Sequence, residues 1–495
     1  MHQSTRKSGK PNKKILIALF AMAAALRLAM VWQPQLWYDE NFTLILSRLP
    51  LDRMLAAVAG DTHPPLYYLL IWPLGQLLKS PNAPVWVLRL PSVVFSLAAL
   101  WVFWRILENF ELRPRVQTVA LILMAIMPIQ LYYAQEARMY APLEFLVLAG
   151  FLAMLKRRWV WFGVIGALMM YTQYYGGFYW AALSLVALVR NLNDRASCKK
   201  AMLASGLAGL AFLPWVIVLA GQMGNIQGSY WMQMNSAGAP LLTLLNTLFF
   251  SLSTSAVIQT PVLLAGFAWL FMALIVIFFG KMQPPNYRFT ICIMAFLPII
   301  LATITSLVWQ PILYYRPLIG STPFLYLIMA APVEMCFDAS GRLLRRRTLY
   351  ALCIVLPAVL ICDISIYSYS GITKNSGGQT ELAYIQEHWQ TGDVVLGVSD
   401  QDYVNIVPYA PGLPFYLIPQ CSSERGRLSD ATRQAIGIQS ASPDLAYHHA
   451  WVLWTYSPLT LVGEDCARDL FNLGDPALLN NDDEFVYSGL WLVNK

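Results

Sequence analysis

The sequence predicts a polytopic α-helical membrane protein that ends in a water-soluble part. Of the 495 residues, 57% are hydrophobic and only 12% are charged, whereas an ordinary soluble protein carries about 25% charged residues. The apolar residues form runs of about twenty, the helix length that spans a bilayer. From residue 368 onward, 6 basic residues stand against 15 acidic ones, whereas the first 367 residues hold 28 against 12. A basic membrane part and an acidic soluble part are therefore expected.

The first apolar run, residues 15–32, follows a polar and basic segment at 1–14. Because many further spans follow, we interpret this run as an uncleaved anchor and not as a cleaved signal peptide. Either interpretation places residue 39 outside the cytoplasm. With the first run, eleven spans are expected, the others at roughly 84–104, 116–133, 139–155, 159–174, 177–189, 201–221, 257–280, 289–309, 317–337 and 348–367.

The distribution of basic residues sets the topology. The segment 64–78 is apolar but short, and it contains three prolines. If it lies along the outer surface, 21 basic residues fall on the inner side and six on the outer side, which agrees with the rule that cytoplasmic loops are positively charged. If it spanned, the later basic clusters would all lie outside. Segments 41–59 and 64–78 are therefore predicted to be juxtamembrane helices in the interface.

An odd number of spans places the acidic C-terminal part outside the cytoplasm. Its pattern predicts a small α/β domain, with a helix at 381–390, strands at 393–398 and 451–454, and a closing hairpin at 484–493. The predicted organisation is a cytoplasmic tail (1–14), a membrane domain (15–367) whose first outer loop is 33–83, and an extracytoplasmic domain (368–495).

This topology places polar groups at several outer ends of the helix bundle. Ionisable residues at such positions are costly to desolvate and are candidates for function. Snorkelling of the arginines toward lipid headgroups is the alternative. The residues concerned are Asp39, Glu40, Asp61, His63, Glu136, Arg138, Tyr140, Gln173 and Arg316.

Asp39 and Glu40 form an adjacent pair of carboxylates directly after the anchor. They could serve as the N-cap and first-turn acid of a helix at 41–49. Alternatively, a carboxylate at this position could take the proton from an acceptor hydroxyl as that oxygen attacks. A phosphate leaving group departs as an anion when arginine stabilises it. Carboxylates that face arginines thus suit transfer from a phosphate-linked donor to an alcohol.

His63 precedes two prolines, so it could belong to a rigid turn, contact a phosphate or position a substrate. Glu40, Asp61 and His63 could in principle hold a divalent metal, although their spacing is not diagnostic, and no cofactor is assigned. Cys421 and Cys466 are the two cysteines of the acidic part. They could form a disulfide if that part is exported. The basic charge lies in short loops, so no nucleic-acid partner is expected.

Two motifs resemble the dolichyl-phosphate-mannose protein mannosyltransferase superfamily, a group with the GT-C fold of membrane glycosyltransferases. One is the Asp39-Glu40 pair after the first span, followed by the Asp-x-His-Pro-Pro-Leu sequence at 61–66. The other comprises Arg89-Leu90-Pro91-Ser92 and the segment Gln135–Tyr140, which are similar to the bacterial branch. The resemblance covers about residues 15–220.

The resemblance implies inverting transfer of a monosaccharide from a polyprenyl-phosphate carrier to a lipid, glycan or protein hydroxyl, as by a hexosyl- or mannosyltransferase, on the outer face of a bacterial cytoplasmic membrane. Asp39 would be the base and Glu40 would support it. Arg138 and Arg316 would hold the carrier phosphate together with His63. Asp61, Glu136, Tyr140 and Gln173 would shape the cavity. In related lipid A aminoarabinose transferases, lysine occupies the position of His63, which argues against lipid A as the acceptor.

Two other classes of protein remain open. A transporter or flippase for a lipid or sugar would place its ionisable residues near the bilayer midplane and often shows repeated halves. This sequence shows no such repeat, and its carboxylates gather at one face. A scaffold protein would work through the C-terminal part, where no catalytic constellation is evident. The enzyme is the leading hypothesis.

Overall fold

The computed structural model describes most of residues 12–229, 285–336, 378–422, 428–455 and 478–494, together with a few positions between 239 and 274. The contacts divide the chain into two units, each made of three segments. The first unit holds residues 1–32, 89–213 and 232–372. The second holds residues 33–88, 214–231 and 373–495. Hydropathy alone did not predict that the first outer loop shares a unit with the C-terminal segment.

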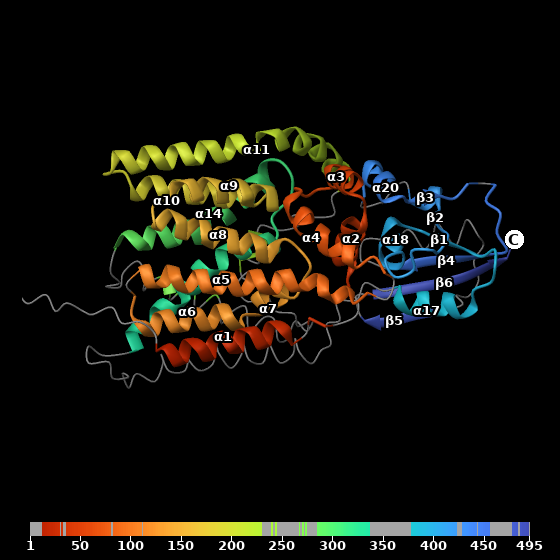
Figure 1. The fold of residues 1–495 in the computed structure, drawn as a ribbon, viewed down its shortest axis with the longest axis horizontal. Coiled ribbons are helices and arrows are strands. Elements are labelled where there is room, and N and C mark those ends of the chain that lie inside the picture. Colours follow the sequence, from red (N-terminus) through yellow and green to blue (C-terminus); the bar gives the residue numbers. More distant parts are fainter. Residues whose placement is uncertain are drawn as a thin grey trace, which may run out of the picture. The chain divides into compact units, whose positions relative to one another are not determined.

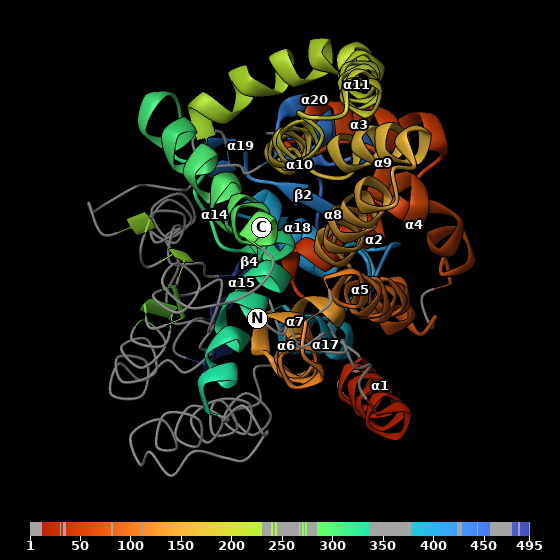
Figure 2. The same cartoon turned by 90° about the vertical axis from the view of Figure 1, so that its left-hand side faces the viewer.

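The first unit consists of apolar helices that pack side by side. Helix α5 packs against α8, α8 against α9, and α10 against α9 and α14. Figure 1 shows α5, α8, α9 and α10 running alongside one another, and Figure 2 views α5 and α10 close to end-on. The elements are α1 (Lys13–Leu28), α5 (Leu90–Asn109), α6 (Pro114–Ile126), α7 (Pro128–Ala134), α8 (Tyr140–Leu155), α9 (Trp159–Thr172), α10 (Gly176–Arg190), α11 (Arg195–Ser229), α14 (Pro285–Val308), η2 (Arg316–Ser321), α15 (Thr322–Ala330) and η3 (Ala331–Cys336).

Three of the described helices are long and apolar enough to cross a membrane, and the bent pair α6–α7 would make a fourth. Helices α4, α8, α9 and α10 are apolar but shorter. A membrane protein is thus supported, whereas the number of eleven spans stays a prediction. The expected span at 348–367, and most of the one at 257–280, lie outside the described residues.

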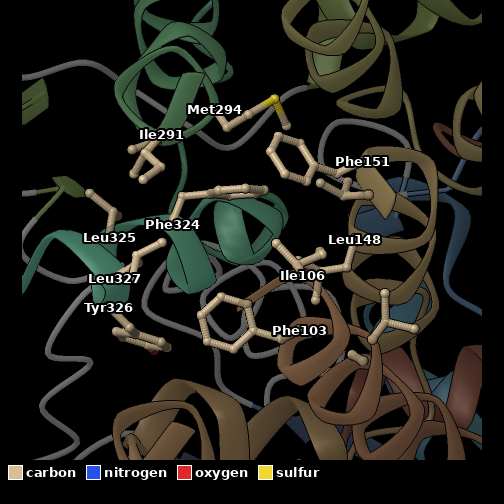
Figure 3. Close-up of a cluster of buried hydrophobic side chains, with 14 of the residues drawn as sticks. Phe103, Ile106, Leu148, Phe151, Ile291, Met294, Phe324, Leu325, Tyr326 and Leu327 are labelled. Atoms are coloured by element: carbon tan, nitrogen blue, oxygen red, sulfur yellow. The ribbon is translucent and has the colours of Figure 1, made fainter. Parts of the chain in front are cut away.

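The interior of the first unit is apolar and is filled mainly by aromatic and branched side chains. Phe103 and Phe151 are fully buried, and the Phe151 ring meets that of Phe324 edge-on at 5.0 Å. Figure 3 shows side chains of α5, α8, α14 and α15 converging in this cluster. Interlocked aromatic rings of this kind hold the four helices in one arrangement.

A buried arginine occupies the bend between α6 and α7. The two helices meet at 51°, and Pro128, the first residue of α7, has no N–H to continue the ladder of α6. The guanidinium of Arg27 donates to the carbonyl oxygens of Ala125 at 2.9 Å and Met124 at 3.1 Å. It also donates to Ser96 Oγ at 2.9 Å. The arginine, which the sequence places within the first span, therefore satisfies carbonyls at the end of α6.

The second unit combines three short helices of the first loop with a sheet from the C-terminal segment. Helix α2 packs on α4 and α18, and α3 packs on α20. The final part of α11, from Pro214 onward, belongs to this unit too. The elements are α2 (Tyr38–Arg48), α3 (Leu51–Gly60), α4 (Leu66–Leu77), η1 (Val85–Arg89, of which Arg89 lies in the first unit), α17 (Gln379–His388), β1 (Val394–Gly397), α18 (Asp400–Ile406), β2 (Phe415–Leu417), α19 (Pro419–Ser422), α20 (Asp430–Ile436), β3 (Gln439–Ser440), β4 (His449–Thr455), β5 (Leu478–Asp483) and β6 (Val486–Asn494).

The six strands form a mixed sheet in the order β3-β2-β1-β4-β6-β5. Strands β3, β2, β1 and β4 are parallel, whereas β6 runs antiparallel to both β4 and β5. Because side chains alternate along a strand, Val395 faces the apolar cluster that includes α17 and α18, and Val394 faces the cluster on the other side. The helix expected at 381–390 corresponds to α17, and the strands expected at 393–398 and 451–454 correspond to β1 and β4. The hairpin expected at 484–493 covers β6 alone, because its other strand, β5, lies before residue 484.

Candidate active site

The first turn of α2 carries the two adjacent carboxylates. The helix begins at Tyr38, and its N-cap is Trp37, which makes no side-chain capping bond. Asp39 is therefore a first-turn residue and not the N-cap, a position where the helix dipole favours negative charge. Asp39 is half-buried, whereas Glu40 is fully buried. Two neighbouring carboxylates thus occupy different environments, and Asp39 is the one that a solute can reach.

The far end of α2 is held by Arg48. Its Nε donates to the carbonyl oxygen of Leu78 at 2.8 Å and its Nη1 to that of Pro408 at 2.6 Å. Burial lowers the pKa of the Arg48 guanidinium, and the neighbouring Tyr409 opposes that shift. Because both acceptors are backbone carbonyls, this arginine joins α2 to the end of α4 and to the turn that follows α18.

The loop after α3 brings Asp61 and His63 together. The Nδ1 of His63 lies 2.9 Å from Oδ2 of Asp61 and 3.2 Å from Oγ1 of Thr62. The imidazole also meets the ring of Tyr68 edge-on. A carboxylate partner fixes the orientation of an imidazole and favours a proton on the nitrogen that faces it. The predicted pair therefore shares one hydrogen bond.

Two side chains from elsewhere in the second unit hold the end of α3. The last carbonyls of a helix have no partner within that helix. Thr432 Oγ1 donates to Ala57 O at 3.0 Å, and Gln222 Nε2 donates to Val58 O at 2.9 Å. Gln222 lies in α11, is fully buried, and also donates to the carbonyl oxygen of His63. No motif marked Gln222 or Thr432 in the sequence.

In the first unit, a tight turn between α7 and α8 carries Glu136 and Arg138, both buried. Ser92 Oγ donates to the carbonyl oxygen of Glu136, and Gln135 Nε2 donates to that of Leu26 at 2.8 Å. The turn is therefore attached to α5 and α1. This explains why the polar Gln135–Tyr140 segment keeps a defined conformation among apolar helices.

Three of the predicted residues gather around the buried Tyr133. Arg316 lies within electrostatic reach of Tyr133 and Tyr140, and Glu136 interacts with Tyr133 as well. The rings of Tyr133 and Tyr140 are 4.8 Å apart, and the Arg316 guanidinium lies over the ring of Tyr314. A tyrosine next to an apolar run is typical of the aromatic belt at a membrane interface. The structure instead buries it among charged groups, an arrangement suited to binding an anion at Arg316.

Gln173 lies at the turn between α9 and α10, where its Oε1 accepts a hydrogen bond from the amide of Tyr175. The hydroxyl of Tyr175 donates to the carbonyl oxygen of Ile312, four residues before Arg316. Gln173 thus stabilises a turn that is attached to the Arg316 segment. Its predicted role in shaping a cavity stays a prediction.

The nine residues proposed from the sequence are distributed over both units. The structure brings Asp61 together with His63, and it brings Glu136, Tyr140 and Arg316 together around Tyr133. The sharing of one cavity by all nine residues stays a prediction. In the part of the chain that the structure describes, no three metal-ligating side chains form a cluster. Asp39, Glu40, Asp61 and His63 lie in the second unit, and Glu136, Arg138, Tyr140, Gln173 and Arg316 lie in the first.

Cys421 is disulfide-bonded. Its expected partner, Cys466, lies outside the described residues, so this particular pairing stays a prediction.

The sequence and the structure of the chain were compared with those of known proteins, and the similarities indicate its class of fold. Residues 62–218 match the family described as dolichyl-phosphate-mannose-protein mannosyltransferase. No curated protein sequence matches the chain. The structure is similar to that of ArnT from Cupriavidus metallidurans in the apo state, with a TM-score of 0.54, 13% identity, and coverage of 96% of this chain and 97% of ArnT.

Two further structures agree. ArnT bound to undecaprenyl phosphate is similar with a TM-score of 0.54 and 14% identity, over 97% of this chain and 98% of ArnT. The oligosaccharyltransferase AglB from Archaeoglobus fulgidus, in complex with an inhibitory peptide and a dolichol-phosphate, is similar with a TM-score of 0.51 and 12% identity, over 89% of this chain and 69% of AglB.

The chain therefore has the GT-C fold of membrane glycosyltransferases. Within that class, the family match confirms the resemblance to the dolichyl-phosphate-mannose protein mannosyltransferase superfamily. The matched range includes residues 62–66 of the motif at 61–66, whereas Asp39, Glu40 and Asp61 lie before it.

Proposed function

We propose that the chain is an inverting glycosyltransferase that transfers a monosaccharide from a polyprenyl-phosphate carrier to an acceptor hydroxyl. The observation that carries the proposal is the accessible Asp39 next to the fully buried Glu40, in a chain with the GT-C fold. The bound undecaprenyl phosphate of ArnT and the dolichol-phosphate of AglB support a lipid-phosphate donor. The proposed location is the outer face of a bacterial cytoplasmic membrane, with the N-terminus inside and the C-terminal segment outside.

In the proposed reaction, the acceptor oxygen attacks the anomeric carbon from the face opposite the phosphate. Asp39 takes the proton of the acceptor hydroxyl as the new C–O bond forms. The bond between the anomeric carbon and the phosphate oxygen breaks, and polyprenyl phosphate leaves with the bonding electrons. Arg138 and Arg316 stabilise this anion through charge-assisted hydrogen bonds, and His63 contributes a further contact. Glu40 supports Asp39.

The remaining predicted residues shape the surroundings of the reactants. Glu136 and Tyr140 neighbour Tyr133 near Arg316, Gln173 orders the next turn, and Asp61 orients His63. We assign no metal ion to the reaction.

Release of free polyprenyl phosphate tests the proposal. The purified protein is incubated with polyprenyl-phosphate monosaccharides and an envelope extract that supplies acceptors. The wild-type chain should release polyprenyl phosphate, whereas Asp39→Asn should release almost none. Asp52→Asn is the matched control because Asp52 is an exposed first-turn acid of α3 in the same unit. It should retain full activity.

Equal release by Asp39→Asn and the wild type would remove Asp39 from the chemistry. Transport of intact donor across proteoliposomes without any release would identify a transporter instead. Arg138→Ala should chiefly raise the KM for the donor, and unchanged donor affinity would contradict the phosphate role. The exposed Arg53 supplies the corresponding control, Arg53→Ala.

A further inference from the structure

A tyrosine from the C-terminal segment contacts the chain on both sides of the carboxylate pair. Tyr409 belongs to the turn that follows α18. Its hydroxyl accepts a hydrogen bond from the amide of Leu36 at 3.0 Å and donates one to Oδ1 of Asn41 at 3.0 Å. Asn41 Nδ2 in turn donates to the carbonyl oxygen of Leu36 at 3.1 Å. These three bonds close around residues 36–41, so Asp39 and Glu40 lie within the enclosed segment.

The adjacent residue holds the other end of the same helix. The carbonyl oxygen of Pro408 accepts from Arg48 at 2.6 Å. Asn41 and Arg48 are seven residues apart, and this spacing places both side chains on one face of α2 after about two turns. Residues 408 and 409 therefore fix both the rotation of α2 about its axis and the position of its first turn.

The geometry leaves Asp39 on another side of the helix. Asp39 precedes Asn41 by two residues, a separation of about 200° around an α-helix. The face that meets Tyr409 is thus roughly opposite to the face that carries Asp39. The contact can hold the helix without covering the carboxylate that the proposed reaction uses.

We propose that Tyr409 is a positioning residue that fixes the first turn of α2, and with it the Asp39 carboxylate, from the C-terminal segment. This inference rests on the proposed function, in which Asp39 removes the acceptor proton. Misplacement of a reacting group by about 1 Å can cost on the order of a hundredfold in rate. The C-terminal segment is then part of the machinery of the reaction, because it sets the orientation of the base.

The test compares Tyr409→Phe with Tyr403→Phe. The first substitution removes the hydroxyl that bonds Leu36 and Asn41. The second is the matched control, because Tyr403 lies in α18 and donates to the carbonyl oxygen of Ile436 within the same segment. Tyr409→Phe should lower kcat by roughly tenfold to a hundredfold and leave the donor KM within about twofold. Tyr403→Phe should retain the wild-type kcat.

Asn41→Ala provides a second route to the same answer if Tyr409→Phe folds poorly. It should lower kcat in the same way. The loss in the double variant should be smaller than the sum of the two single losses, expressed as free energies of activation, because both changes break the bond between Tyr409 and Asn41. Wild-type kcat in Tyr409→Phe, or an equal loss in Tyr403→Phe, would overturn the proposal. Additive losses in the double variant would do so too.

Hydrogen exchange separates this proposal from the proposed function. The Leu36 amide should exchange faster in Tyr409→Phe than in the wild type and in Tyr403→Phe, whatever the assay of transfer gives. If Asp39→Asn is fully active, the proposed role of Asp39 as the base is contradicted, whether or not the Tyr409 contact exists. If the Leu36 amide exchanges equally in all three proteins, the Tyr409 contact itself is refuted.

Discussion

The Nδ1 of His63 lies 2.9 Å from the Oδ2 of Asp61, and both side chains are mostly buried, with 22% and 10% of their surfaces exposed. Thr62 lies between them in the sequence and places its hydroxyl near the same nitrogen. A carboxylate in this position orients the imidazole ring. The phosphate contact proposed for His63 would then be made by its other nitrogen, Nε2.

Asp61→Ala should therefore raise the donor KM more than it lowers kcat. A hydrogen bond to a charged group contributes about 1.5–3 kcal/mol, and its loss should weaken donor binding by roughly tenfold or more. Initial rates at varied donor concentration measure the effect. Asp52→Ala in α3, an exposed acid of the same unit, should leave KM unchanged. An unaltered KM in Asp61→Ala would remove the pair from donor binding.

Gly60→Ala should destabilise the second unit. A Cβ at Gly60, the last residue of α3, would lie 2.8 Å from Oγ1 of Thr432 and 2.9 Å from Oγ of Ser429. Ser429 is the N-cap of α20, and its hydroxyl accepts from the amide of Thr432, so neither group can move without breaking a bond. Overpacking of this kind costs about 1–3 kcal/mol.

Thermal unfolding of the purified protein measures the cost. Gly412→Ala is the matched control, since a Cβ at Gly412 meets nothing within 4 Å. A melting temperature for Gly60→Ala equal to that of the control would show that α3 and α20 pack less closely than described.

Local patterns predicted much of this chain. Hydropathy and charge located most of the helices described in the first unit, because a helix in the hydrocarbon core of a bilayer needs a long run of apolar side chains. Alternation and turn residues located β1, β4 and β6, whereas β5 was missed because it lies before the segment expected to form the hairpin. The Asp39-Glu40 pair and the motif at 61–66 could be predicted as candidate site residues, because acidic groups are rare beside apolar runs.

Long-range contacts could not be predicted in this way. Tyr409 meets Asn41 across 368 residues of sequence, and Gln222 meets Val58 across 164. Neither residue belongs to a motif, and a single tyrosine in a turn or a single glutamine in an apolar helix gives no periodic signal. The grouping of the first loop with the C-terminal segment depends on such pairs, so only the folded chain reveals it.

The stability of the C-terminal sheet should depend on pH through Asp393. Burial by itself raises the pKa of this carboxyl, but hydrogen bonds from Trp451, the Gln390 amide and His449 outweigh it and lower the pKa overall. A carboxyl with a depressed folded pKa adds stability above its unfolded pKa of about 3.9. That contribution is lost as the pH falls through the folded pKa.

Urea unfolding followed by tryptophan fluorescence, from about pH 6 down to about pH 3, measures this dependence. Asp393→Asn should be less stable than the wild type near pH 6, and the difference should shrink as the pH falls. Asp444→Asn, which changes an exposed aspartate of the same segment, should follow the wild type throughout. A difference between Asp393→Asn and the wild type that stays constant with pH would exclude the carboxylate as the source.

Arg27→Met should destabilise the first unit more than any surface substitution. The arginine is fully buried, and it donates to two carbonyls at the end of α6, where the bend before Pro128 interrupts the helical ladder. Methionine fills a similar volume but cannot donate, so both carbonyls would lose their partner. An unsatisfied buried polar group costs about 1–3 kcal/mol of stability. The substitution leaves two carbonyl oxygens and Ser96 Oγ without this donor, so the total cost should be several kcal/mol.

Thermal unfolding in detergent and the yield of monodisperse protein measure the effect. Arg27→Lys should be intermediate, because an ammonium group can reach fewer of the four acceptors that the planar guanidinium now serves. The exposed Arg158 provides the control, and Arg158→Met should unfold like the wild type. If Arg27→Met unfolds at the same temperature as Arg158→Met, the bend between α6 and α7 is stable without the arginine. The carbonyl oxygens at the end of α6 would then need no side-chain donor.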